Sequence, residues 1–160
     1  MEETGEAARP RTLVLALGNP LRGDDGVGAA VLAALAELPD LPGGVTLLEG
    51  GTPGLETVLL LEGYARAIVV DAADMGRQPG AWARFTPADV SLGTGAGGNL
   101  HSAGLAEALA LGGALGILPA EIVIYGVQPA LVGWEPGLSD DVRAAVPEVC
   151  RAIRQEVGTR

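Results

Sequence analysis

The chain has 160 residues, enough for one domain with a hydrophobic core, and its single cysteine excludes an intrachain disulfide or a cysteine-rich metal cluster. A formal net charge of −10 argues against nucleic acid as a partner, because binding to a phosphate backbone depends on clustered Lys and Arg. Hydrophobic residues make up 48% of the chain but aromatic residues only 3%, so we expect a core of aliphatic side chains and alanine.

The N-terminal segment MEETGEAARPR carries three glutamates and no apolar run, which does not fit a secretory signal. We expect residues 1–11 to form a disordered tail and residues 12–158 to form a single domain. The apolar stretch 105–127 is interrupted by Glu107, Pro119 and Glu121, so a helix followed by a strand explains it better than a membrane span. We therefore expect a cytoplasmic protein with no membrane partner.

Apolar runs alternate with helical patterns along the chain. Four runs are typical of buried strands: 12–18, 44–51, 66–73 and 121–127. Apolar residues recur at helical spacing in three segments between them: Val27, Val31, Leu32 and Leu35; Leu55, Val58 and Leu59; Leu105, Ala106, Leu109 and Ala110. This order predicts an α/β fold in which helices cover both faces of a mainly parallel sheet.

Two further elements complete the expected fold. Residues 81–86 leave no room for a preceding crossover helix, so they predict a strand added in the antiparallel direction. A last helix is expected to start at Ser139, with acidic residues in its first turn, and to be kinked or split at Pro147. Its expected buried stripe is Val142, Val146, Val149 and Ile153.

The segment LVLALGNPLRGDDGVGAAVLAAL, residues 13–35, reads as a strand, a glycine-rich turn and a helix. Many α/β proteins bind a phosphate at such a turn, but this turn lacks G-x-G-x-x-G spacing and a Lys followed by Ser or Thr. Asp24 and Asp25 would also repel a pyrophosphate. The glycines of this turn would let a ligand approach the backbone closely, but its two carboxylates favour a cation or a proton-transfer role.

The carboxyl ends of parallel strands meet at one edge of a sheet, where ligands bind. We expect Asp25 and Asp71 to lie at this edge, with His101 entering from the glycine-rich loop 91–99, so that two carboxylates and one imidazole could hold a divalent metal. Ordinary structural roles remain open for each: Asp24 or Asp25 capping the helix that follows, Asp71 forming a turn, and His101 capping or packing. If Asp24 is the cap, Asp25 faces the crevice.

Five motifs occur in order along the chain: LGNPLRGDDGVG, LLEGGTPGLE, IVVDA, NLHSAGLAEAL and YGVQP. Together they resemble the hydrogenase maturation endopeptidases, which remove a short C-terminal peptide from the large subunit of nickel–iron hydrogenases. The resemblance runs from Leu13 to Ile153 and implies a three-layer α/β/α fold with a twisted, mainly parallel five-stranded sheet. It also implies that Asp25, Asp71 and His101 hold a metal. Some members carry glutamate where Asp25 stands, so the shorter side chain here changes the coordination distances.

The resemblance further implies the substrate. The enzyme would recognise nickel already inserted in the hydrogenase large-subunit precursor, and its own residues would complete the coordination of that metal, or of another divalent metal. The metal would polarise the scissile carbonyl or activate a water, while Asp25 or Asp71 remains possible as the general base. The turn that contains Gly50, Gly51 and Thr52 would bind the extended substrate tail, although it also fits an ordinary tight turn.

Two other functions stay open. One is a flavodoxin-like module that binds a nucleotide or flavin, against which the acidic turn and the scarcity of aromatic residues argue. The other is an aspartic-type protease that uses Asp25 and Asp71 without metal. Nucleophilic catalysis is not expected. Cys150 lies beside the apolar stripe of the last helix, and Ser102 directly follows the only histidine, so that the two neighbouring side chains would point in different directions.

Overall fold

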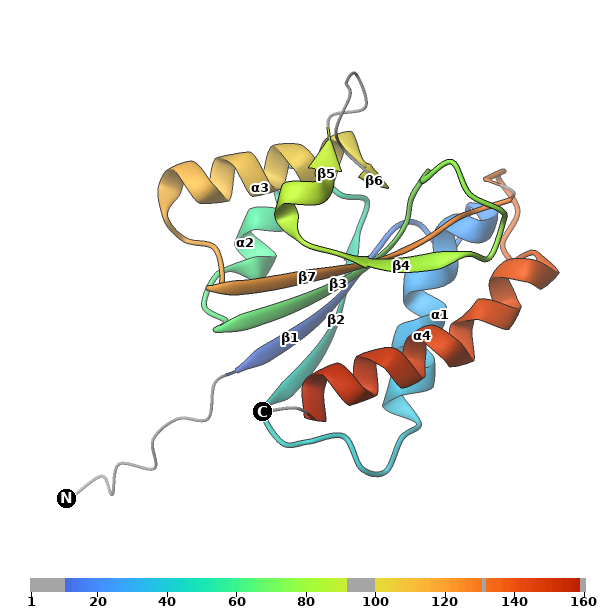
Figure 1. The fold of residues 1–160 in the computed structure, drawn as a ribbon, viewed down its shortest axis with the longest axis horizontal. Coiled ribbons are helices and arrows are strands. Elements are labelled where there is room, and N and C mark those ends of the chain that lie inside the picture. Colours follow the sequence, from blue (N-terminus) through green and yellow to red (C-terminus); the bar gives the residue numbers. More distant parts are fainter. Residues whose placement is uncertain (1–10, 92–99, 131, 159–160) are drawn as a thin grey trace.

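The computed structural model describes residues 11–91, 100–130 and 132–158, and of residues 91, 100 and 101 only the backbone. Five strands form one sheet in the order β2-β1-β3-β7-β4 (Figure 1). The strands are β1 (Thr12–Leu17), β2 (Val45–Gly51), β3 (Arg66–Ala72), β4 (Trp82–Phe85) and β7 (Glu121–Val127). β4 alone runs antiparallel, along β7, as the sequence predicts.

Helices cover both faces of the sheet, which confirms the expected three-layer fold (Figure 1). One face carries α1 (Val27–Ala36) and α4 (Asp140–Gly158), and the other carries α2 (Thr57–Leu61) and α3 (Ala103–Leu115). Alternate side chains of β1 point to opposite faces: Val14 and Ala16 pack in the α1–α4 layer, and Leu13, Leu15 and Leu17 in the α2–α3 layer. A strand buried on both faces must be apolar throughout, as β1 is.

A second, two-stranded sheet lies outside the main one. β5 (Val90–Ser91) pairs in parallel with β6 (Leu100–His101), with Ser91 opposite His101. β6 leads directly into α3, whose position therefore fixes the backbone of His101. Most of the predicted loop 91–99, and nearly all of the predicted N-terminal tail, lie outside the described residues.

The predicted helix stripes are correct in most places and wrong in a few. α1 buries Val27, Val31, Leu32 and Leu35 as expected. Around α2, Val58 is buried as expected, but Leu55, which precedes the helix, and Leu59 are exposed, and Thr57 and Leu61 are buried in their place. In α3 the stripe is Leu105, Ala108, Leu109 and Gly112, so Ala106 and Ala110 are not part of it.

α4 is the longest helix in the described part of the chain, and it continues through Pro147 without being split. Of its expected stripe, Val142, Val149 and Ile153 are fully buried, while Val146 is half-buried. Within the described residues, no helix is both long and apolar enough to cross a membrane.

Candidate active site

The loop after β1 folds tightly over the end of its own strand. Gly18 has φ +109°, and a Cβ at this position would lie 2.2 Å from the backbone oxygen of Asp25, so only glycine fits here. Gly28, in the first turn of α1, would likewise place a Cβ 2.8 Å from the Leu17 oxygen and 2.9 Å from the Val70 oxygen. The start of α1 therefore rests directly on the carboxyl ends of β1 and β3.

This packing holds Asp25 at the carboxyl edge of the sheet. Its Oδ2 accepts a hydrogen bond of 2.7 Å from the backbone N–H of Asn19, and the residue is half-buried. The Gly18 N–H donates to the Gly51 oxygen at 2.8 Å, which joins the loop after β1 to the turn after β2. One carboxylate oxygen of Asp25 is thus oriented by the backbone at this edge.

Asp71 lies on β3, one residue before the strand ends, and is only 2% exposed. Burial and the negative charge of Asp25 together raise the pKa of its carboxyl to about 8, against a hydrogen bond from the Ala72 backbone that lowers it. The two carboxylates are therefore close enough to repel each other. The structure brings Asp25 and Asp71 together, as the sequence predicts.

Asp24 has a different role from the expected one. Neither the 3-10 turn Gly23–Gly26 nor α1 has a side-chain cap, so the prediction that Asp24 caps α1 is wrong. Its fully buried carboxylate instead accepts hydrogen bonds from the Ala130 N–H at 2.8 Å, and from the N–H and hydroxyl of Ser139 at 2.6 and 2.7 Å. Ser139 immediately precedes α4, so Asp24 neutralises donors at the start of that helix instead.

The backbone of His101 reaches the same region through α3. A Cβ on Gly104, in the first turn of α3, would lie 2.2 Å from the Pro53 oxygen, so this turn packs against the backbone that follows Thr52. The side chain of His101 is outside the described part of the structure. Among the described side chains, no three His, Cys, Asp or Glu residues form a group that could hold a metal.

The turn with Gly50, Gly51 and Thr52 borders this region at the end of β2. A Cβ on Gly50 would press against Leu15 and Leu17 of β1, whereas Gly51 has φ +69° and open space around its α-carbon. Gly51 and Thr52 are exposed. The turn therefore offers accessible backbone beside Asp25.

Comparison with known proteins identifies the family. The model of the hydrogenase maturation protease family, HycI, matches residues 29–156. The chain belongs to this family. It is 36% identical over 145 residues to the hydrogenase expression/formation protein HupD of Rhizobium leguminosarum bv. viciae, covering 89% of this chain and 72% of that protein. With HupD of Rhodobacter capsulatus it is 33% identical over 150 residues, 90% of this chain and 71% of the relative.

Solved structures agree with this assignment. The hydrogenase maturating endopeptidase HybD from Escherichia coli has a TM-score of 0.76 and 29% identity, covering 92% of this chain and 94% of that one. The solution structure of an endopeptidase from Escherichia coli has a TM-score of 0.79 and 27% identity, covering 92% of this chain and 94% of that one. The maturation protease therefore has the known α/β fold of its family, and it is an enzyme and not a flavin- or nucleotide-binding module.

Cys150 does not contribute to the site of this maturation protease. It lies on α4 in the core between that helix, α1 and the sheet, and burial raises the pKa of its thiol. A buried thiol held in its neutral form is a poor nucleophile. The expectation that Cys150 serves packing agrees with this placement.

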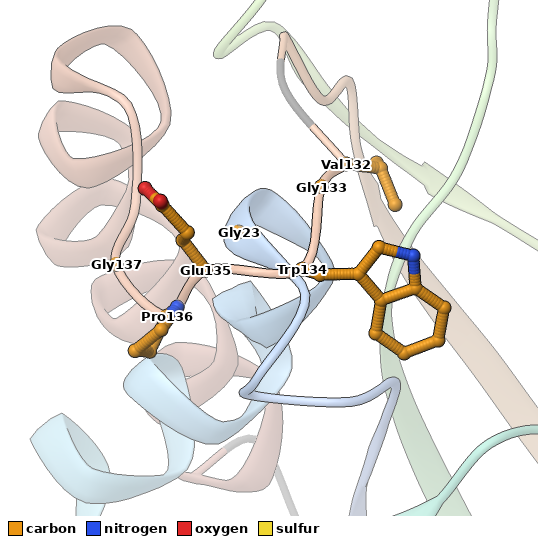
Figure 2. A pocket seen from close by; sticks show the side chains of 7 residues that line it. All are labelled: Gly23, Val132, Gly133, Trp134, Glu135, Pro136 and Gly137. Atoms are coloured by element: carbon orange, nitrogen blue, oxygen red, sulfur yellow. The ribbon is translucent and has the colours of Figure 1, made fainter.

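A pocket beside the first loop was not expected from the sequence. It is lined by Gly23 and by residues 132–137, and Figure 2 shows the Trp134 indole projecting from that segment. The Gly23 N–H donates to the Glu135 oxygen at 2.7 Å, which joins the two segments. The sequence contains one weak signal for this pocket, a lone tryptophan in a Gly- and Pro-rich stretch of a chain poor in aromatic residues.

Proposed function

We propose that this maturation protease removes a C-terminal peptide from the large-subunit precursor of a nickel–iron hydrogenase, and that Asp25, Asp71 and His101 bind nickel that the precursor carries. The main supporting observation is the juxtaposition of Asp25 and Asp71 at the carboxyl edge of the sheet, inside a family of hydrogenase maturation proteases.

The chemistry of this pair favours a cation. Burial and the neighbouring charge of Asp25 both disfavour the ionised form of Asp71, so its carboxylate is unfavourable as long as no positive charge lies beside it. A divalent cation between the two carboxylates removes both penalties at once. Nickel fits two carboxylate oxygens and one imidazole, and these three donors leave positions for ligands that the precursor supplies.

Each of the chain's own residues would then contact a particular part of the bound substrate. Asp25, oriented by the Asn19 N–H, and Asp71 face the metal of the precursor. The exposed backbone of Gly51 and Thr52 lies beside them and binds the extended tail. Nickel in the precursor would polarise the scissile carbonyl or activate a water, and one of the two carboxylates would accept the proton of that water.

A second mechanism has one observation in its favour. With a pKa of about 8, Asp71 is protonated at neutral pH in the absence of metal, next to the charge of Asp25. Paired carboxylates in which one holds a proton are the arrangement of aspartic proteases. In this case the enzyme would cleave the precursor without any metal.

Cleavage of two precursor preparations, read by mass spectrometry, tests the proposal. The enzyme is incubated with nickel-loaded and with nickel-free large-subunit precursor. We expect loss of a C-terminal peptide from the loaded form only. Equal cleavage of both forms would support the metal-independent mechanism, and cleavage of neither would contradict the proposed substrate.

A further inference from the structure

Within the described part of the chain, Arg22 forms no ion pair with an acidic side chain. Its guanidinium carbon lies 4.3 Å from the centre of the Trp134 ring, and its Nε is buried without a hydrogen-bond partner in the described part of the chain. The Nε of Arg66 also lacks a hydrogen-bond partner, but Arg66, Arg84 and Arg154 each form an ion pair with Asp or Glu. A buried N–H with no acceptor costs free energy unless a ligand supplies one, so this arginine is prepared for an anion.

Trp134 makes the other half of the arrangement. The residue is 79% exposed, although a large apolar side chain such as an indole is normally covered. Leu21, next to Arg22, and Val132, two residues before Trp134, are also 62% and 47% exposed. Figure 2 shows the Glu135 side chain pointing in the opposite direction from the indole. The nearest carboxylate along this segment therefore leaves the Arg22 charge available.

The pair is fixed in place beside the candidate active site. Gly23, next to Arg22, donates to Glu135, next to Trp134, at 2.7 Å. Asp24 binds Ala130 and Ser139 on either side of the Trp134 segment. Asp25 follows in the same 3-10 turn. A group bound by Arg22 and Trp134 is thereby held near Asp25.

We propose that Arg22 and Trp134 form a substrate subsite that binds a carboxylate of the precursor close to the bond that is cut. This inference rests on the proposed function. Charge complementarity supports it, because a chain with a net charge of −10 repels an acidic peptide except where a cation is presented. The planar guanidinium can bind a carboxylate through two hydrogen bonds, and the part of the exposed indole that Arg22 does not cover can pack against the apolar part of the same segment.

Steady-state processing of nickel-loaded precursor tests this subsite. We expect Arg22→Gln and Trp134→Ala to raise KM about tenfold, with kcat changed much less, since each loses substrate binding and no reacting group. Arg22→Lys, which keeps the charge but not the fork, should lie between. Arg151→Gln, at an exposed position of α4, removes the same charge elsewhere and should leave KM unchanged. Circular dichroism checks the fold of each variant. An unchanged KM in Arg22→Gln overturns the subsite.

Two altered precursors distinguish the sources of the carboxylate. In one, the acidic side chains around the cut are replaced by amides, and in the other a short Gly-Ser extension moves the terminal carboxylate away. The precursor that carries the recognised group in altered form should show the high KM even with the wild-type enzyme, and Arg22→Gln should then add nothing. If Arg22→Gln raises KM equally for every precursor, no carboxylate is recognised and the proposal is wrong.

A binding measurement separates this proposal from the proposed function. In a Trp82→Phe background Trp134 is the only tryptophan of the enzyme, so its fluorescence reports on the subsite once the signal of the precursor alone is subtracted. We expect the precursor to change this fluorescence, and Arg22→Gln to weaken the response about tenfold. If wild-type enzyme does not cleave the precursor but this response persists, the proposed function fails and the subsite stands. Normal cleavage with no response from Trp134 refutes the subsite alone.

Discussion

The carboxylate of Asp24 accepts hydrogen bonds from both the backbone N–H and the hydroxyl of Ser139, which lies 115 residues further along the chain. This contact ties the loop after β1 to the start of α4, and the adjoining bond from the Ala130 N–H ties it to the segment that follows β7. Two neighbouring aspartates thus have separate tasks. Asp24 holds the loop, and Asp25 is a candidate ligand at the carboxyl edge of the sheet.

Asp24→Asn should therefore destabilise the protein, although asparagine would be an adequate helix cap. Its amide group places N–H donors against donors of Ala130 or Ser139, and a buried unsatisfied group costs about 1–3 kcal/mol. Urea denaturation measures the change. Ser139→Ala, which removes only the hydroxyl, should cost less. An Asp24→Asn variant as stable as the wild type would show that the contact contributes nothing.

Asp25→Asn should keep the stability and lose the chemistry. Its side-chain oxygen can still accept from the Asn19 N–H, but the negative charge that binds a cation is gone. We expect processing to fall at least about 100-fold, in the range of a lost metal-binding interaction. Asp25→Glu, which keeps the charge, should be the mildest change at this position. A cleavage assay that ranks Asn above Glu would contradict the assignment.

His101→Ala should abolish processing and leave the fold intact, because the residue is the only imidazole in the chain and stands in a two-residue strand outside the main sheet. Circular dichroism and a cleavage assay test the two halves separately. Ser102→Ala, at the next position, serves as the control and should stay active. Normal cleavage by His101→Ala would remove the histidine from the mechanism.

Asp71 should make the metal-free protein less stable as the pH rises. Its pKa is about 8 in the folded state against an ordinary value of 3.8, so the folded state binds more protons between these values and loses stability through that window. Asp71→Asn removes this dependence. In chelator, we expect the free energy of unfolding of the variant, measured by urea denaturation, to rise by a few kcal/mol relative to that of the wild type between about pH 5 and about pH 8.5. Parallel curves for the two proteins would show that Asp71 is not strained by burial.

Local patterns were sufficient for most of the fold. Strands buried on both faces, such as β1 and β3, read as continuous apolar runs, and α1 has a clear helical stripe. The α2 stripe was right for Val58 but wrong for Leu55 and Leu59, which face outward despite their helical spacing, because a helix of five residues is positioned by its neighbours. The meeting of Asp25 and Asp71 followed from the rule that parallel strands end at one edge.

Contacts between distant segments could not be predicted in the same way. Nothing in the sequence around Asp24 points to Ser139, and nothing around Arg22 points to Trp134, because each pair is joined only when β7 and its following loop pack beside the loop after β1. The capping prediction for Asp24 failed for this reason. The local pattern indicated a cap on the helix that follows Asp24 in the sequence, whereas in the fold its carboxylate binds the residue before α4.

The central claim is that Asp25, Asp71 and His101 recognise nickel brought by the substrate. Three ligands from separate segments bind a free ion weakly, because ordering them costs entropy that the precursor's own ligands would offset. The direct test is to strip the enzyme with chelator, remove the chelator, and measure cleavage of nickel-loaded precursor by mass spectrometry. The account predicts full activity without added metal. An enzyme that stays inactive until nickel or zinc is restored to it would contradict the account.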